Sequence, residues 1–174
     1  MNDQGRRVAA FGRAAGLAGC AVGLLVWCQQ MLQCVPRLIN GSYNSYLPSS
    51  KGTTLPPLSP FDTVKHLAEY VANALARAKE ATGGKTPKVM VMGAKGRCGQ
   101  GAVEFLHLVG IEDASKWDLE ETAKGGPFPE ILDHDVFVNC IYLMGAIPPF
   151  LTKGTSSKDP AFSLNILSHY LTQL

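Results

Sequence analysis

The feature that most constrains this chain is a short apolar strand that leads directly into a glycine-rich turn. Residues Lys88 to Met92 read Lys-Val-Met-Val-Met, and Gly93, Gly96 and Gly99 follow with Gly-x-x-Gly-x-x-Gly spacing. In a strand–turn–helix unit, the first glycine permits the tight turn and the second lets the backbone approach a pyrophosphate. The third lets the helix pack against the strand. The pattern predicts the phosphate-binding half of a Rossmann-like nucleotide site.

Charged side chains near this turn extend the prediction. A helix N-terminus offers free N–H groups and a partial positive charge to a phosphate, and Arg97 adds a full charge that can pair with phosphate or ribose oxygens. Asp118 follows at close to the spacing of about 20 residues at which a carboxylate binds the adenosine ribose diol. Because that carboxylate would repel a 2′-phosphate, the pattern favours NAD over NADP. A Rossmann-like domain that holds another nucleotide, or none, is the alternative.

The order of the expected elements indicates an α/β fold. Strands and helices alternate from residue 87 onward, which is typical of a parallel sheet. A long helix precedes them, with a start signal at Ser59 and Pro60 and an end at Gly83 and Gly84. The later elements are expected as strands at Lys88–Met92, Ser115–Leu119 and Asp135–Leu143, a helix at Gly99–Val109 and a short helix at Phe128–Leu132.

These expectations divide the chain into three parts. Residues 1–60 hold a long apolar helix and a linker, which we interpret as a remnant of an inter-domain region. Residues 61–154 form a partial Rossmann-like NAD-binding domain with parallel strands, and residues 155–174 form a divergent C-terminal helix that starts at Asp159 and Pro160.

The apolar segment near the start of the chain admits two interpretations. No charge occurs between Arg13 and Arg37, and Ala14–Cys28 is small and apolar throughout. With basic residues in front, it resembles a signal peptide or a short membrane span. A span needs about 20 apolar residues, however, and Gln29 and Gln30 follow too soon. A helix buried inside a soluble protein is the preferred interpretation, and a targeting or membrane role is the alternative.

Composition excludes several classes of protein. A net charge of +2 is too small for a nucleic-acid surface, and 46% hydrophobic with 17% charged residues indicates a globular chain. Five cysteines at irregular spacing form neither a disulfide framework nor a zinc pattern, so we expect no metal site. This cysteine usage favours a reducing compartment.

Six strings in one order are similar to a single family. They are Asn2–Gly12, Gly93–Ala102, Lys116–Asp118, Gly125–Phe128, Asn139–Leu143 and Ile147–Phe150. Together they resemble the NAD-dependent, lysine-forming saccharopine dehydrogenases, over roughly residues 2 to 153. Such a combination is far more specific than the glycine motif alone.

The resemblance implies an activity and a cell compartment. These enzymes cleave saccharopine oxidatively to lysine and 2-oxoglutarate, with NAD as hydride acceptor, in lysine biosynthesis. They have two Rossmann-like domains with the active site between them, and the implied location is cytoplasmic.

The resemblance also implies roles for individual residues. Arg6 would contact NAD, while Arg7 and Phe11 would face saccharopine. Gly96 and Arg97 would hold the pyrophosphate, and Gly93 and Gly99 would belong to the same cofactor-binding loop. Asp118 would hold the adenosine ribose, and Thr122 and Tyr142 other parts of the dinucleotide. Cys98 and Cys140 match two family cysteines that can approach each other. A disulfide between them is one alternative, and two free buried thiols are the alternative favoured in a reducing cytosol.

Departures from the family shape the functional expectation. The lysine and histidine of the family's acid–base chemistry lie outside this chain, so no residue is assigned a catalytic role. The stretch after about Gly154 does not resemble the family, and Lys95 and Gln100 replace typical residues of the glycine loop. We expect this chain alone to be inactive, with a non-catalytic nucleotide- or partner-binding module as the alternative. An exposed apolar helix and an open sheet edge would favour a homodimer.

Overall fold

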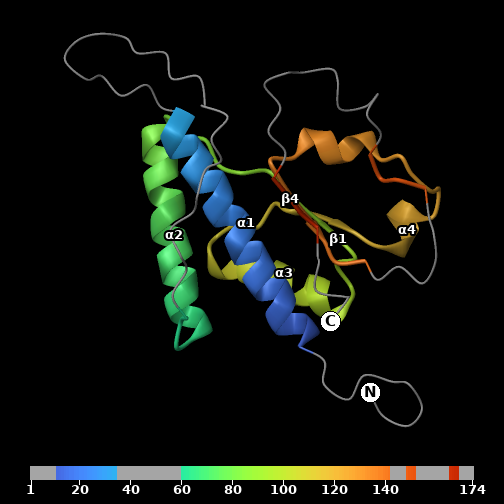
Figure 1. Ribbon diagram of the computed structural model, residues 1–174, viewed down its shortest axis with the longest axis horizontal. Coiled ribbons are helices and arrows are strands. Elements are labelled where there is room, and N and C mark those ends of the chain that lie inside the picture. Colours follow the sequence, from blue (N-terminus) through green and yellow to red (C-terminus); the bar gives the residue numbers. More distant parts are fainter. Residues whose placement is uncertain (1–10, 35–59, 142–147, 152–164, 169–174) are drawn as a thin grey trace.

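Four parallel strands form the centre of the structure, a computed structural model that describes residues 11–34, 60–141, 148–151 and 165–168 (Figure 1). The strand order is β2-β1-β3-β4. The strands are β1 (Val89–Met92), β2 (Ser115–Trp117), β3 (Val136–Asn139) and β4 (Asn165–Ser168). Met92 aligns with Trp117 on one side and with Asn139 on the other, so these strands end at one level. The α/β class with parallel strands is confirmed.

The central strand β1 is buried on both faces, as expected for a parallel sheet covered on two sides. Val89 and Val91 pack with helices α1 (Gly12–Cys34), α2 (Val64–Ala81) and α3 (Arg97–Leu108). Met90 and Met92 face the other way, toward a smaller cluster around Phe128 and Ile131. Ile131 belongs to the 3₁₀ helix η1 (Pro129–Asp133). Because successive side chains of a strand point to opposite faces of the sheet, β1 contributes to a hydrophobic cluster on each side.

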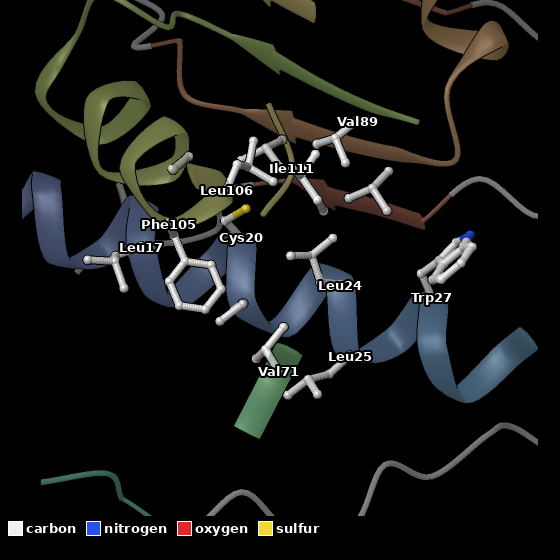
Figure 2. Packing of buried hydrophobic residues seen from close by; sticks show 14 of the residues in the cluster. Leu17, Cys20, Leu24, Leu25, Trp27, Val71, Val89, Phe105, Leu106 and Ile111 are labelled. Carbon is white, nitrogen blue, oxygen red and sulfur yellow. The ribbon is translucent and has the colours of Figure 1, made fainter. Parts of the chain in front are cut away.

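Helix α1 (Gly12–Cys34) lies across the sheet and α3, and it supplies much of the larger core (Figure 2). Leu24 and Trp27 are almost wholly buried, among side chains of α2, α3 and β1. The expectation that this helix is left exposed without neighbours is therefore wrong, because α2 and α3 cover it. Residues Gly12–Leu32 are long and apolar enough to cross a membrane, but half of that window is buried within the protein. Packing accounts for its apolar composition.

Helices α1 and α3 approach each other through glycines. A Cβ at Gly16 would lie 1.8 Å from the carbonyl oxygen of Cys98, and a Cβ at Gly101 would lie 2.0 Å from that of Arg13. Real Cβ atoms do not come this close to a backbone atom, so the crossing requires glycine on both helices. Beside it, the Arg13 guanidinium donates two hydrogen bonds of 2.7 Å to the Glu104 carboxylate. The crossing fixes the first turn of α1 against the first turn of α3.

Several element boundaries differ from the sequence-based expectations. Helix α2 begins at Val64, because the Thr63 side chain accepts a hydrogen bond from the His66 N–H and caps it. Strand β2 ends at Trp117, because Asp118 caps the short helix α4 (Leu119–Thr122). The C-terminal helix is contradicted where the structure describes that part of the chain, since Asn165–Ser168 is a strand paired with β3. Alternating hydrophobicity over these few residues is too short to distinguish the two.

Replacing Gly16 with alanine tests the crossing. The added methyl group would meet the Cys98 backbone, so the helices must separate, and we expect a loss of about 3 kcal/mol in the free energy of unfolding. Gly19→Ala is the matched control on the same helix, because nothing lies within 4 Å of its Cβ position. It should leave stability unchanged or raise it by up to about 1 kcal/mol through helix propensity. Urea titrations in which both variants unfold at the wild-type midpoint would refute the crossing.

Candidate functional site

The glycine turn connects β1 to α3 at the carboxyl end of the sheet. Gly93 adopts φ = 84°, a left-handed conformation that favours glycine, and a Cβ there would lie 3.0 Å from the Cys140 backbone. A Cβ at Gly99 would lie 2.1 Å from the Gly93 carbonyl oxygen, so this glycine lets α3 pack onto the turn. A Cβ at Gly96 would meet only that same oxygen, at 3.3 Å, which leaves its outer side open. Each glycine therefore has the geometry that its position in the pattern predicts.

The start of α3 presents backbone N–H groups that no side chain caps. Gly96 occupies the N-cap position without a side-chain hydrogen bond, and the exposed Arg97 is the first helical residue. The N–H groups of the first helical turn have no partner inside the helix, and the helix dipole adds partial positive charge there. This end of α3 can therefore accept an anion.

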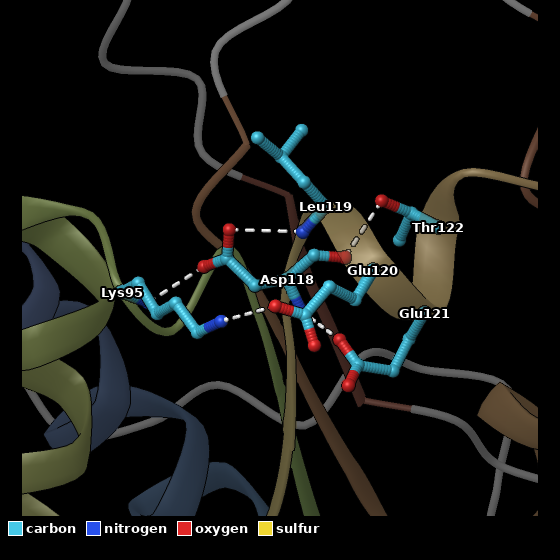
Figure 3. Close-up of polar contacts among 6 residues, drawn as sticks. All are labelled: Lys95, Asp118, Leu119, Glu120, Glu121 and Thr122. Atoms are coloured by element: carbon cyan, nitrogen blue, oxygen red, sulfur yellow. Dashed lines mark hydrogen bonds and ion pairs between the residues drawn. The ribbon is translucent and has the colours of Figure 1, made fainter.

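Asp118 ties the end of β2 to the glycine turn (Figure 3). Its Oδ2 accepts a 2.7 Å hydrogen bond from the Lys95 N–H, and its Oδ1 accepts a 2.9 Å bond from the Leu119 N–H. The Lys95 and Leu119 N–H groups favour the charged carboxylate and hold the pKa of Asp118 below its usual range. The carboxylate is thus ionised, oriented and placed beside the loop, as the spacing of about 20 residues predicted.

Glu121 completes a capping box around Asp118. The Glu121 Oε2 accepts a 2.7 Å hydrogen bond from the Asp118 N–H, while the Thr122 hydroxyl donates to the Asp118 carbonyl at 2.8 Å. The Asp118 N–H lowers the pKa of Glu121. Sequence reasoning missed this residue, although the Asp-x-x-Glu pattern of residues 118–121 is a capping-box signal. The backbone of Asp118 is therefore fixed from within its own turn, while its side chain is held both by that turn and by Lys95.

Lys95 pairs across the turn with Glu120. The Lys95 Nζ lies 3.1 Å from the Glu120 Oε1, and the two side chains are 70% and 79% exposed. This contact raises the pKa of Lys95. An exposed pair of this kind adds at most about 1 kcal/mol to the free energy of unfolding. Its main effect is to hold the Lys95 ammonium group beside Glu120.

An open groove of about 690 Å³ runs from this cluster along α3. Its lining includes Ala94, Lys95, Gln100, Val103, Glu104, His107, Leu108, Lys116, Asp118 and Glu121. The groove lies between the exposed flank of α3 and β2, which is an edge strand of the described sheet. It is large enough for part of a nucleotide, and its lining includes charged side chains of α3 and β2 as well as Asp118.

Cys98 and Cys140 meet where α3 begins and β3 ends, and both are free thiols. The Cys140 side chain hydrogen-bonds to the Cys98 sulfur and lowers the pKa of Cys98 to about 7. The same contact, together with burial, raises the pKa of Cys140. The approach implied by the resemblance is therefore present, as a hydrogen bond between the two sulfurs.

The remaining candidate residues fall into two groups. Arg6, Arg7 and Tyr142 lie outside the described residues. Phe11 is 77% exposed just before α1, and its neighbour Gly12 would place a Cβ 3.3 Å from the Arg97 Cβ. The structure thus brings the start of α1 to the glycine turn, a juxtaposition that no local sequence pattern predicted. Among the described residues, no group of three His, Cys, Asp or Glu side chains could hold a metal ion.

The strand, glycine turn and helix, with a carboxylate held at the end of the neighbouring strand, define a Rossmann-like α/β domain. No protein-family model matches the chain. Three curated relatives are NAD(+)-dependent, L-lysine-forming saccharopine dehydrogenases. The one from Candida albicans is 47% identical over 87% of this chain, the one from Schizosaccharomyces pombe 41% over 87%, and the one from Emericella nidulans 43% over 95%.

The matched segment is only part of each relative. The chain spans 38% of the Candida albicans protein, 37% of the Schizosaccharomyces pombe protein and 40% of the Emericella nidulans protein. Over most of its length, this chain is therefore similar to part of each of these saccharopine dehydrogenases. This confirms the resemblance inferred from the six strings.

The thiol pair gives a pH-dependent prediction. With a pKa of about 7, Cys98 should be alkylated by iodoacetamide with a rate midpoint near pH 7, because the thiolate is the reactive form. Cys140→Ala removes the donor that stabilises this thiolate, so the midpoint should move up toward about 8.5. Cys20 is the internal control, since burial raises its pKa to about 12 and it should stay unmodified in the folded protein. Peptide mass mapping would contradict the assignment if Cys140→Ala left the Cys98 midpoint in place.

Proposed function

We propose that this chain forms the NAD-binding part of a saccharopine dehydrogenase-type oxidoreductase. We further propose that its 174 residues, taken by themselves, bind NAD without turning over saccharopine. The observation that carries the proposal is the Asp118 carboxylate held at the glycine turn by the Lys95 N–H. The names of the relatives, which specify NAD(+), support the choice of cofactor.

The uncapped start of α3 fits a pyrophosphate. The amides of Arg97, Cys98 and Gly99 follow an N-cap glycine that brings no side chain of its own. Gly96 keeps the approach open, and the exposed Arg97 side chain supplies a charge that can pair with phosphate oxygens. Gly93 and Gly99 keep the turn tight, so that the first amides of α3 and the Arg97 side chain can contact the same phosphate.

Asp118 fits the adenosine ribose. Each of its carboxylate oxygens accepts one backbone N–H, and an ionised carboxylate has about four lone-pair sites, so acceptor capacity remains for a diol. The backbone bonds hold the group ionised and in one orientation before a ligand arrives. Pre-orientation reduces the entropy lost on binding.

Bound NAD would supply the hydride acceptor, and the chain would supply position and charge. The Gly93–Gly99 turn would fix the pyrophosphate, and Asp118 the adenosine end, so that the far end of the dinucleotide lies at a set distance from the sheet. By resemblance, Arg6, Thr122 and Tyr142 would hold other parts of NAD, and Arg7 and Phe11 would face saccharopine. An arginine fork suits one of the substrate's carboxylates.

The absence of turnover follows from acid–base chemistry. By resemblance, the catalytic lysine and histidine of the family have no counterpart among these residues. Of the histidines in the described part of the chain, His66 lies on α2, His107 is paired with Glu112, and His134 is bonded to Ser115. None contacts the glycine turn. Hydride transfer also requires substrate and nicotinamide to be held together, which in this family involves both domains.

A non-catalytic nucleotide- or partner-binding module is the second candidate. The same glycine turn would bind the nucleotide of such a module. Lys95 and Gln100 replace typical residues of the family's glycine loop, which favours a loop whose function differs from that of the family. Gln100 donates to the Lys95 carbonyl at 3.0 Å, so the two altered positions form one contact.

Calorimetric titration with NAD tests the cofactor site. We expect saturable binding, and Arg97→Ala should weaken it about tenfold, because a charge-assisted hydrogen bond to phosphate is lost. Arg77→Ala is the control, since Arg77 is an exposed arginine on α2. The NAD affinity of this variant should match that of the wild-type chain. No heat and no thermal shift at millimolar NAD would refute the cofactor assignment.

An assay with saccharopine and NAD tests the second half of the proposal. We expect no NADH absorbance from the purified chain. If the chain binds NAD and saccharopine-dependent NADH nevertheless accumulates, the proposed lack of turnover is wrong, and the cofactor assignment stands.

Self-association is a separate proposal, which follows the sequence-based expectation of a homodimer. The apolar face of α1 no longer supports it, because α2 and α3 cover that face. The edge of β2 is the remaining basis, since its outer backbone groups have no strand partner in the described sheet. Sedimentation velocity of the chain, which we propose to be cytoplasmic, should show dimers, and Lys116→Pro at this edge should shift them to monomers. A monomer at all concentrations would refute the dimer.

A further inference from the structure

We propose that Glu120 determines cofactor choice by holding Lys95 away from the position that a 2′-phosphate would occupy. The inference rests on the proposed function, because it concerns the adenosine end of the same NAD site. Without Glu120, a lysine in the glycine turn would be the group that pairs with the additional phosphate of NADP.

The geometry places Lys95 beside the ribose position. Its backbone N–H bonds to the Oδ2 of Asp118, the carboxylate assigned to the ribose, over 2.7 Å. The side chain of the same residue then extends over the turn to the Glu120 Oε1, 3.1 Å from its Nζ (Figure 3). The ammonium group is therefore within one side-chain length of the diol position, and a carboxylate already holds it.

Charge explains why this contact would discriminate between cofactors. A phosphate monoester carries a charge of about −1.5 to −2 at pH 7. Three carboxylates stand along residues 118–121, and Lys95 is the cation that contacts this cluster. While Glu120 pairs with Lys95, a 2′-phosphate would meet uncompensated negative charge. Asp118 and Glu121 would supply two repulsive charges, so Glu120 both adds a third and removes the compensating cation.

The high exposure of the pair sets the size of the effect. Because both side chains are mostly in solvent, the interaction is weakened by water and by salt. We therefore expect a several-fold preference from this pair, in addition to the larger preference set by Asp118. The free Lys95 in a Glu120 variant should gain only what an exposed lysine–phosphate contact offers.

The experiment measures the affinities of NAD and NADP for the purified chain. Glu120→Gln should lower the Kd of NADP about fivefold, which corresponds to about 1 kcal/mol. The Kd of NAD should stay within about twofold, because the change spares the phosphate and ribose contacts. The gain should fall when salt is raised from about 0.05 M to about 0.5 M. Adding Lys95→Leu to Glu120→Gln should remove the gain, since the lysine carries it.

Two controls separate this role from a structural one. Glu69→Gln breaks the exposed Lys65–Glu69 pair on α2 and should change neither affinity. A merely structural role for Glu120 would weaken NAD and NADP together and leave their ratio unchanged. That unchanged ratio, or a gain that survives Lys95→Leu, would overturn the inference while leaving the NAD site intact. Failure of the wild-type chain to bind NAD would overturn the proposed function and this inference with it.

Discussion

The close crossing of α1 and α3 is the constraint on which the rest of the structure depends. Gly16 and Gly101 let each helix backbone touch the other, and the Arg13–Glu104 fork fixes the same contact from the outside. Once the helices lie this close, the apolar residues of α1 reach the sheet, and a helix that could have spanned a membrane becomes part of a core. The crossing also brings the start of α1 to the start of α3, where we propose that the pyrophosphate binds.

A second constraint acts at the carboxyl ends of the strands. β1 and β2 end at the same level, so the glycine turn and Asp118 meet although they are far apart in sequence. Asp118 then performs two structural tasks, as the cap of α4 and as the acceptor for the Lys95 N–H. Its orientation is therefore fixed by the fold before any ligand binds. The Cys98–Cys140 contact ties the end of β3 to the same turn, so three segments converge at one point.

Much of this arrangement could be predicted from the sequence because the deciding interactions are local. The glycine spacing requires a left-handed turn and a close backbone approach within a few residues, and the structure shows the turn at Gly93 and the close approach at Gly99. The sequence favours a buried helix for α1, but it does not predict which segments bury it, because Gly16 meets Cys98 in a contact between distant segments that no local pattern encodes. The strand at Asn165–Ser168 differs from the expected helix for the same reason, since it forms by pairing with the distant β3. Glu121 could have been found from the capping-box pattern, whereas the Lys95–Glu120 pair becomes visible only when the two turns are placed side by side.

Hydrogen exchange with and without NAD tests most directly the central claim, that the α1–α3 crossing and the glycine turn form one cofactor-binding unit. NAD should slow amide exchange at Arg97, Cys98 and Gly99 and, in parallel, in the first turn of α1, because Gly12 and Gly16 rest on that end of α3. Helix α2, which does not contact the turn, should exchange at an unchanged rate. Protection at the glycine turn with no change in the first turn of α1, or no protection at either, would contradict the account.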